Sequence, residues 1–194
     1  MFGLDARISL AIFGALSVIS GAALYSAIQE SKITAVLIEL EELGKATTQY
    51  LLDTGSYVKM DPGEECAYLM SSLLVADTVS GWKGPYVSYS VKQFTNDKLV
   101  HPVYGDLLIG ALKISSWDDV TNEDDNGPRC EMTDSQCAIF SCLDGLSDDM
   151  HKALDIKIDG SIVDASNGRI RYKSGSYLCL NVMPYPSNLS QRLN

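Results

Sequence analysis

The chain has 194 residues, which is enough for one compact domain with an appendage but too few for two large domains. Its 25 acidic residues outnumber the 15 basic ones and give a net charge of -10, which argues against nucleic-acid binding because phosphates require cationic partners. Hydrophobic residues make up 46% of the chain and charged residues 21%, which predicts a folded core and not a disordered chain.

The first predicted element is an apolar helix. The run from Ile8 to Ile28 has 21 residues without a charge. As a helix it would be about 31 Å long, close to the ~30 Å hydrocarbon core of a bilayer. It continues into QESKITAVLIEL and not into a small-residue cleavage site, so we interpret it as retained. Its Gly and Ser residues, Gly14 and Gly21 among them, fit either a segment that leaves lipid for protein or an ordinary anchor.

An amphipathic stripe follows without a break. Apolar residues recur at spacings of three and four from Ile33 to Leu51, which is typical of a helix with one buried face. No proline precedes Pro62, and Gly55 is a typical helix stop. The sequence therefore predicts one helix from about Asp5 to Thr54, with an apolar part (1–28), an amphipathic part (29–55) and a globular head after it (56–194). Four charged residues lie off the stripe: Glu39, Glu41, Glu42 and Lys45.

The head shows shorter and mixed patterns. An apolar, helix-like stretch runs from Cys66 to Ala76, and a short helix is expected from Ser147 to Ile158, with Asp148 and Asp149 in its first turn. Alternating residues predict a half-buried strand at 86–91, and further strand candidates follow at 107–114, 136–142, 168–172 and 177–182. A helix followed by strands is typical of an α+β fold, here an antiparallel β-sheet packed on the amphipathic half of the long helix.

All the cysteines follow the apolar run: Cys66, Cys130, Cys137, Cys142 and Cys179. Their spacing lacks the paired C-x-x-C pattern of zinc sites, so disulfides are favoured over metal, with one thiol left over or paired between chains. The spacing alone leaves the connectivity open.

Five acids crowd one stretch of eight residues: Asp118, Asp119, Glu123, Asp124 and Asp125. They fit a solvated surface loop, which we favour, or a calcium site built from hard oxygen ligands. No other cofactor is expected. His101 and His151 lie in no recognisable catalytic motif, and we expect both at the surface and no enzymatic activity.

The chain opens MFGLDAR, with Asp5 just before the apolar run. This opening resembles a mature type IV pilin or type II secretion pseudopilin. In that family a prepilin peptidase removes a basic leader, the new amino terminus is methylated, and an acid in this position pairs with the amine of a neighbouring subunit. The resemblance assigns these roles to Met1 and Asp5. The family usually has Glu instead of Asp, often Phe at the first position and commonly a proline deeper in the span. Arg7 is also unusual for the family, and it could pair with Asp5 within or between chains.

Two later motifs add to the resemblance. Gly81-Trp82-Lys83-Gly84-Pro85-Tyr86 looks like the G-W-x-G-P-Y turn of major pseudopilins, and residues 154–160 with 168–172 are similar to the carboxy-terminal helix-turn-strand of pilin-like proteins. The resemblance implies a pilin-like fold and a disulfide between Cys179 and one of Cys130, Cys137 or Cys142. Some major pseudopilins bind calcium in a loop of the sheet, and the candidate ligands here are Asp118, Asp119, Asp124 and Asp125.

The expected function is that of a filament subunit, in which the apolar helices of many copies form the core. The expected assembly residues are Met1, Phe2, Asp5, Arg7, Gly14 and Gly21. The resemblance implies a homo-oligomer whose partners are the bacterial inner membrane before assembly, the prepilin peptidase and the pilus assembly machinery, and whose final location is the cell surface. The alternatives are a secretion pseudopilin and a monomeric, membrane-anchored periplasmic binding or sensor module.

Overall fold

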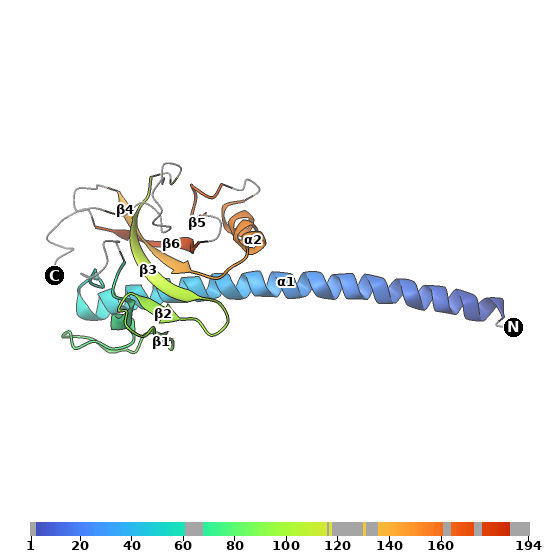
Figure 1. Ribbon diagram of the computed structural model, residues 1–194, viewed down its shortest axis with the longest axis horizontal. Helices are drawn as coiled ribbons and strands as arrows, with labels where there is room; N and C mark the ends of the chain where they lie inside the picture. Colours follow the sequence, from blue (N-terminus) through green and yellow to red (C-terminus); the bar gives the residue numbers. More distant parts are fainter. Residues whose placement is uncertain are drawn as a thin grey trace. The chain divides into compact units, whose positions relative to one another are not determined.

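The computed structural model describes residues 3–60, 68–115, 117, 130, 136–160, 164–172 and 176–186. The chain divides into two compact units, Met1–Leu37 and Ile38–Asn194. A single long helix contributes to both units, and the second unit holds the β-sheet (Figure 1).

The long helix α1 spans Leu4–Thr54 without interruption, which confirms the single helix expected from the sequence. It ends at Gly55, whose φ of 71° lies in the left-handed region and whose N–H donates to the Leu51 carbonyl at 2.8 Å. This is the glycine stop that the sequence indicated, because glycine adopts a positive φ without steric cost.

Residues 38–54 of α1 pack within the second unit. The stripe along this half is buried, with Leu40, Leu43 and Tyr50 at 0% to 1% exposure. The helix also comes very close to the sheet at Gly44, where a Cβ atom would lie 2.7 Å from the Cβ of Val182. Only a residue without a side chain fits this approach, so Gly44 sets the distance between helix and sheet.

The head contains a curled, antiparallel six-stranded sheet in the order β1-β2-β3-β4-β6-β5. This sheet and the long helix confirm the expected α+β class. A β-bulge interrupts the β4–β6 register between Ile139 and Phe140. The strands are β1 (Ser90–Val91), β2 (Lys98–Val100), β3 (Asp106–Lys113), β4 (Cys137–Leu143), β5 (Ile170–Tyr172) and β6 (Leu178–Tyr185).

Both faces of the central strands are covered, since every residue of β4 is buried and so are six of the eight in β3. Side chains on successive strand residues point to opposite faces, so one face can pack on α1 while the other holds a second cluster. That cluster includes Leu108, Phe140 and the paired Cys142 and Cys179, with Trp117 packed against it.

Helix α2 (Asp148–Asp159) begins where the sequence indicated. The Ser147 side chain caps it by accepting from the Met150 N–H, and Asp148 and Asp149 occupy its first turn. Its last residue, Asp159, accepts from the backbone N–H groups of Arg169 and Ile170 at 2.8 to 3.0 Å, which joins the end of α2 to strand β5.

Two predicted elements are largely wrong. The strand expected at 86–91 is limited to β1, because the Tyr86 N–H donates to the Leu74 carbonyl and the half-buried residues after it have no strand partner. In the described part of the helix expected at Cys66–Ala76, only the 3-10 turn η1 (Ser71–Leu74) is helical. Just before it, Leu69 donates its N–H to the Ile109 carbonyl of β3.

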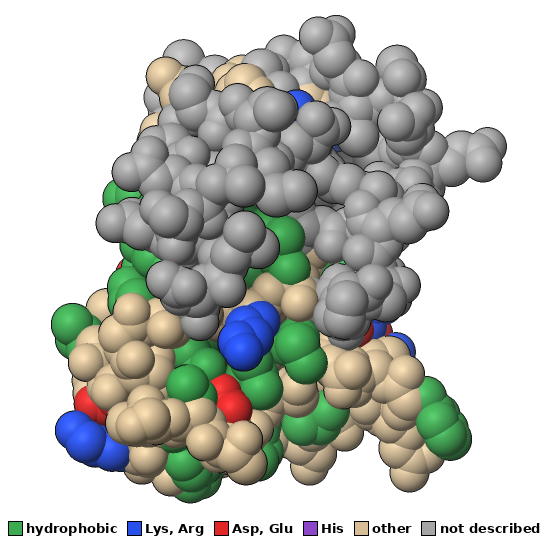
Figure 2. All heavy atoms as spheres, turned by 90° about the vertical axis from the view of Figure 1, so that its left-hand side faces the viewer, with side chains coloured by type: hydrophobic (Ala, Val, Ile, Leu, Met, Phe, Trp, Pro, Cys, Tyr) green, Lys and Arg blue, Asp and Glu red, His purple; other side chains and the backbone are tan. Residues whose placement is uncertain are grey.

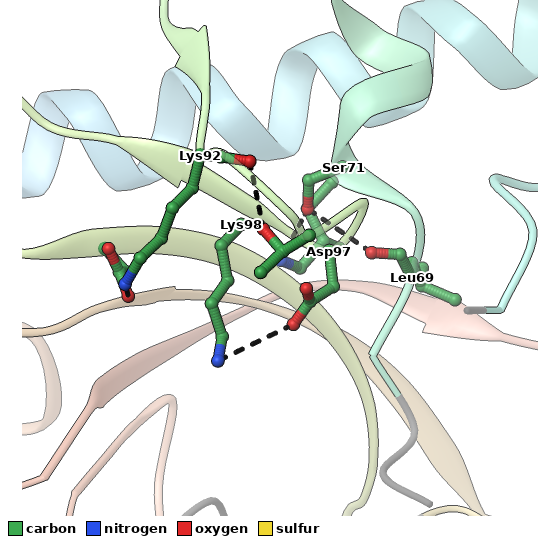
Figure 3. A network of polar contacts seen from close by, with 8 residues as sticks. Leu69, Ser71, Lys92, Asp97 and Lys98 are labelled. Carbon is green, nitrogen blue, oxygen red and sulfur yellow. Dashed lines mark hydrogen bonds and ion pairs between the residues drawn. The ribbon is translucent and has the colours of Figure 1, made fainter. Parts of the chain in front are cut away.

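Polar contacts join η1 to strand β3 (Figure 3), and the Ser72 N–H of η1 donates to the Asn96 carbonyl of the β1–β2 hairpin at 2.9 Å. The Ser71 hydroxyl accepts from the Ile109 N–H at 3.2 Å and donates to the Leu69 carbonyl at 3.4 Å. Asp97 is 1% exposed, and one of its carboxylate oxygens lies 4.0 Å from the Lys98 ammonium. These contacts connect neighbouring elements of the fold, which is the usual role of a buried polar network.

Candidate functional site

The apolar segment, residues 8–28 of α1, is uncovered on every side. All of its residues are exposed, and its ten large hydrophobic side chains are between 45% and 74% exposed. These ten are Ile8, Leu10, Ile12, Phe13, Leu16, Val18, Ile19, Leu24, Tyr25 and Ile28. A helix that is apolar all round belongs in lipid or protein, because a large exposed apolar surface is unfavourable in water.

By length and composition, α1 is able to cross a membrane, with a mean hydropathy of 1.9 over its most apolar window. A serine in the apolar segment can be buried when its hydroxyl bonds within the helix. The Ser17 hydroxyl donates to the Phe13 carbonyl at 2.9 Å. Such a bond satisfies the polar group without water, so the segment suits both a bilayer and a protein core.

Two charges stand at the start of the apolar segment. Asp5 and Arg7 lie in the first turns of α1 and both are exposed. Within the described part of the chain neither has an ion-pair partner. Met1 and Phe2, the other residues expected at this end, lie outside the described residues.

The two glycines assigned to assembly, Gly14 and Gly21, lie within regular helix in the single chain. A Cβ atom added at either position would meet nothing within 4 Å. The space beside each is therefore open to another helix, and close helix packing in membranes uses small residues in this way.

The described surface of the head differs from the apolar segment. On the face drawn in Figure 2, hydrophobic side chains are interspersed with basic and acidic ones. A shallow, open hollow elsewhere on the head is lined by Glu42, Lys45, Ala46, Gln49 and Tyr86. Its mixed lining is typical of an ordinary solvated surface, since scattered exposed apolar residues are normal in soluble domains.

The G-W-x-G-P-Y turn holds the carboxyl end of α1. The Tyr86 hydroxyl donates to one carboxylate oxygen of Asp53 at 3.0 Å, and the Lys83 ammonium lies 3.2 Å from the other. Hydrogen bonds from Gln49, Tyr86 and Lys83 hold the pKa of Asp53 below its usual value. Asp53 carried no sequence signal, because its two partners from the turn, Lys83 and Tyr86, follow it by 30 and 33 residues in the chain.

Gly81 and Trp82 have specific structural roles in this turn. At Gly81, whose φ is 90°, an added Cβ would collide with the Asp53 carbonyl oxygen. The Trp82 indole N–H donates to the Leu73 carbonyl at 3.2 Å, and its ring packs edge-on against Tyr86. The peptide bond between Gly84 and Pro85 is cis. The turn therefore closes over the last turn of α1.

A second contact lies one turn earlier on α1. The Tyr50 hydroxyl donates to Asp77 at 2.6 Å. Burial and the Asp77 charge raise the pKa of Tyr50 well above its ordinary value. Burial alone would raise the pKa of Asp77, but the hydrogen bonds from Tyr50 and the Thr78 and Val79 amides outweigh it and lower that pKa.

Both histidines are buried, so the expectation that they lie at the surface is wrong. His101 Nδ1 accepts from the Val103 and Tyr104 amides at 3.1 and 2.9 Å. The ring hydrogen therefore lies on Nε2, which donates to Glu39 at 2.7 Å. His151 is 0% exposed beside the Tyr172 ring, and its burial lowers its pKa.

The burial of the two histidines was not predicted from the sequence, because the residues that cover them are distant along the chain. Glu39 and His101, for example, are 62 positions apart. Glu39 was also expected off the packed stripe, whereas its carboxylate reaches this buried ring.

The structure joins the described cysteines as Cys130–Cys137 and Cys142–Cys179. The second bond includes Cys179, and its partner is one of the three that the resemblance implies. The two residues lie directly opposite each other on the adjacent strands β4 and β6, which brings their Cα atoms to 4.1 Å. Cys66 lies outside the described residues.

The candidate calcium ligands, Asp118, Asp119, Asp124 and Asp125, also lie outside the described residues. Among the residues that the structure does describe, no group of three or more His, Cys, Asp or Glu side chains could hold a metal ion. No protein-family model, curated protein or solved structure matches this chain.

Proposed function

We propose that this chain is a structural subunit of a type IV pilin-like filament. In this proposal the apolar segments of many copies pack against one another and supply the cover that a single chain lacks. The observation that carries the proposal is that all of residues 8–28 are exposed, on a helix whose other half, from Ile38 to Thr54, is packed in a folded head.

The charges at the start of the apolar segment favour assembly over simple anchorage. A charge enclosed in apolar surroundings costs about 2.5 to 3.5 kcal/mol on insertion scales unless a partner meets it, and in a filament core the Asp5 end of each copy would be enclosed among the apolar segments of its neighbours. A monomeric anchor gains nothing from carrying Asp5 at the edge of its apolar run, whereas a subunit can neutralise it with a cation of a neighbour. The resemblance assigns that cation to the Met1 amine.

A type II secretion pseudopilin is the second candidate, because of the turn at residues 81–86. Gly81, Trp82, Pro85 and Tyr86 match the turn of major pseudopilins, and in this chain Tyr86, together with Lys83, bonds to Asp53 at the carboxyl end of α1. In either case we propose that the chain is inserted in the inner membrane, is processed by the prepilin peptidase, and is then extracted by an assembly machinery into an extracellular or periplasmic filament.

The test is to shear filaments from cells that produce the chain and to analyse them by electron microscopy and mass spectrometry. We expect filaments in which this chain is the repeating component and in which Met1 carries a methyl group on its amine. Recovery of the chain only as a monomer in the membrane fraction, with an unmodified amine, would contradict the proposal and favour the anchored module.

A variant tests the role of the acid. Asp5→Asn keeps the side-chain size and removes the charge, so we expect filament yield to fall by about tenfold or more while the head stays folded. The matched control is Asp149→Asn, the same change at an exposed acid of α2, which should assemble normally. Normal yield from both variants would remove the proposed pairing of Asp5.

A further inference from the structure

Asp5 and Arg7 cannot satisfy each other within one chain. Both residues are helical, and two positions along a helix correspond to about 200° around its axis. Side chains two residues apart therefore point to nearly opposite sides. In agreement with this geometry, the described residues contain no ion pair between Asp5 and Arg7.

The two sides of the helix also differ in shape. Three large side chains, Ile12, Leu16 and Ile19, lie within about 40° of the Asp5 side. The Arg7 side carries Gly14 and Gly21, one on each side of Val18, with open space beside both glycines, and its next large side chain is Tyr25. The helix thus has a ridge that starts with an acid and, on the opposite side, a surface with two gaps that starts with a base.

We propose that Asp5 of one copy pairs with Arg7 of the next copy in a parallel array of helices, with the ridge of the first helix against the glycine gaps of the second. This inference rests on the proposed filament function and names a partner for Asp5 other than the Met1 amine. The two charges differ by about 3 Å in height along the axis, so a parallel neighbour needs only a small shift to bring them together.

This contact is heterologous, because it joins two different surfaces of the same segment. Each copy uses its Asp5 side toward one neighbour and its Arg7 side toward another. A heterologous contact that does not close into a ring continues without limit and produces a helical filament. The opposite placement of the two charges therefore directs assembly toward an open array and away from a closed pair.

An antiparallel pair is the competing arrangement. Reversing one helix would place Arg7 opposite Glu30 and Asp5 opposite Lys32, since both pairs share one centre. Such a pair requires the two heads on opposite sides of the membrane, whereas copies inserted from one sequence share one orientation. The parallel array is therefore the arrangement available to copies that start in the same bilayer.

Charge exchange tests the inference in cells that assemble the full chain. Arg7→Gln should lower filament yield by about tenfold or more, as Asp5→Asn does, and Arg7→Lys should keep most of it. The double variant Asp5→Arg with Arg7→Asp exchanges the two charged sides and should restore assembly. The single variants Asp5→Arg and Arg7→Asp should each fail alone and form mixed filaments when produced together. Formation of the Cys142–Cys179 disulfide in every variant checks that the head has folded.

The outcomes separate this inference from the proposed function. Normal filaments from Arg7→Gln, together with loss in Asp5→Asn, would overturn the Arg7 pairing and leave the filament and the amine pairing intact. Failure of the double variant, with its head folded, would also overturn it. Both alternatives predict that failure, because the exchange creates like-charge contacts with the Met1 amine in one and with Glu30 and Lys32 in the antiparallel pair. Absence of filaments from the unmodified chain would instead reject the proposed function.

Discussion

The two halves of α1 contain similar residues in opposite environments. In residues 38–54, the apolar side chains on one face are buried within the head, with Leu40 and Leu43 at 0% exposure. In residues 8–28, leucines and isoleucines are exposed on all sides. α1 is one continuous helix. The rest of the chain covers one face of residues 38–54 and leaves residues 8–28 exposed.

This difference shows what each half requires from the sequence. The covered half needs its apolar residues on one side only, and it tolerates charges such as Glu42 and Lys45 on the other. The uncovered half has no charge on its whole circumference between Ile8 and Ile28, which suits a surrounding of lipid or protein on every side. The following substitutions compare matched positions on the two halves.

The largest difference is expected between two identical leucine truncations. Leu43→Ala should lower the free energy of unfolding of the head by about 2 to 5 kcal/mol, because it leaves a cavity in a packed core. Leu16→Ala, the same change on the uncovered half, should alter it by less than about 0.5 kcal/mol. Urea unfolding of the full chain in detergent, followed by tryptophan fluorescence, measures both. Equal losses would show that the apolar segment is part of the head's core.

Two glycines provide the next comparison. Gly44→Ala places a methyl group 2.7 Å from the Val182 Cβ, and this overpacking should cost about 1 to 3 kcal/mol. Gly14→Ala meets nothing within 4 Å in the single chain, so it should favour the helix by up to about 1 kcal/mol. Adding Val182→Ala should recover part of the Gly44→Ala loss in a double-mutant cycle. If the changes in the free energy of unfolding of the two single variants simply added in the double variant, Gly44 and Val182 would not be in contact.

Acid should affect the head through His151. Because burial lowers the pKa of His151 in the folded state, the unfolded chain binds its proton first as the pH falls below about 6.5. Stability contributed by the neutral ring is therefore complete above that pH and declines on acidification, by at most about 1.4 kcal/mol per pH unit. His151→Leu should flatten the decline between pH 7 and 5 in thermal unfolding. If the slope of stability against pH were the same in His151→Leu, the decline would come from another titratable group.

The smallest effect is expected from two tyrosine hydroxyls. Tyr50→Phe removes the 2.6 Å hydrogen bond to Asp77 and should cost about 0.5 to 1.5 kcal/mol. It should also move acid unfolding, since the lowered pKa of Asp77 gives stability that is present above pH 3.8 and is lost as the pH falls below it. Tyr25→Phe, on the uncovered half, should leave the unfolding curve of the head unchanged.

Much of the fold was predictable because its signals are local. The long helix follows from unbroken periodicity and the Gly55 stop, and α2 follows from Ser147 as its cap. The longer strands β3, β4 and β6 are mostly apolar runs of seven or eight residues, which is long enough to be recognised. Strand β2 has only three residues, which is too short for a pattern, and the alternation at 86–91 reflects half-burial without a strand partner.

Long-range pairs were not predictable from residue patterns. Nothing local indicates that Glu39 contacts His101, or that Asp53 receives Lys83 and Tyr86. The pairing of Cys142 with Cys179 depends on the register of β4 against β6, which spacing does not fix. The candidate site differs in this respect, because Asp5, Arg7 and the apolar run are local features whose exposure follows from composition.

The contacts of Lys83 and Tyr86 with Asp53 should help the head to resist a pulling force on α1. α1 is held at its last turn by the residues of the 81–86 turn, and the buried stripe extends from that turn back to Leu40. We expect tension applied along the helix axis to load these contacts in shear, so that they must yield together and not one turn at a time. A strand or loop pulled away from an edge would instead peel open bond by bond under far less force.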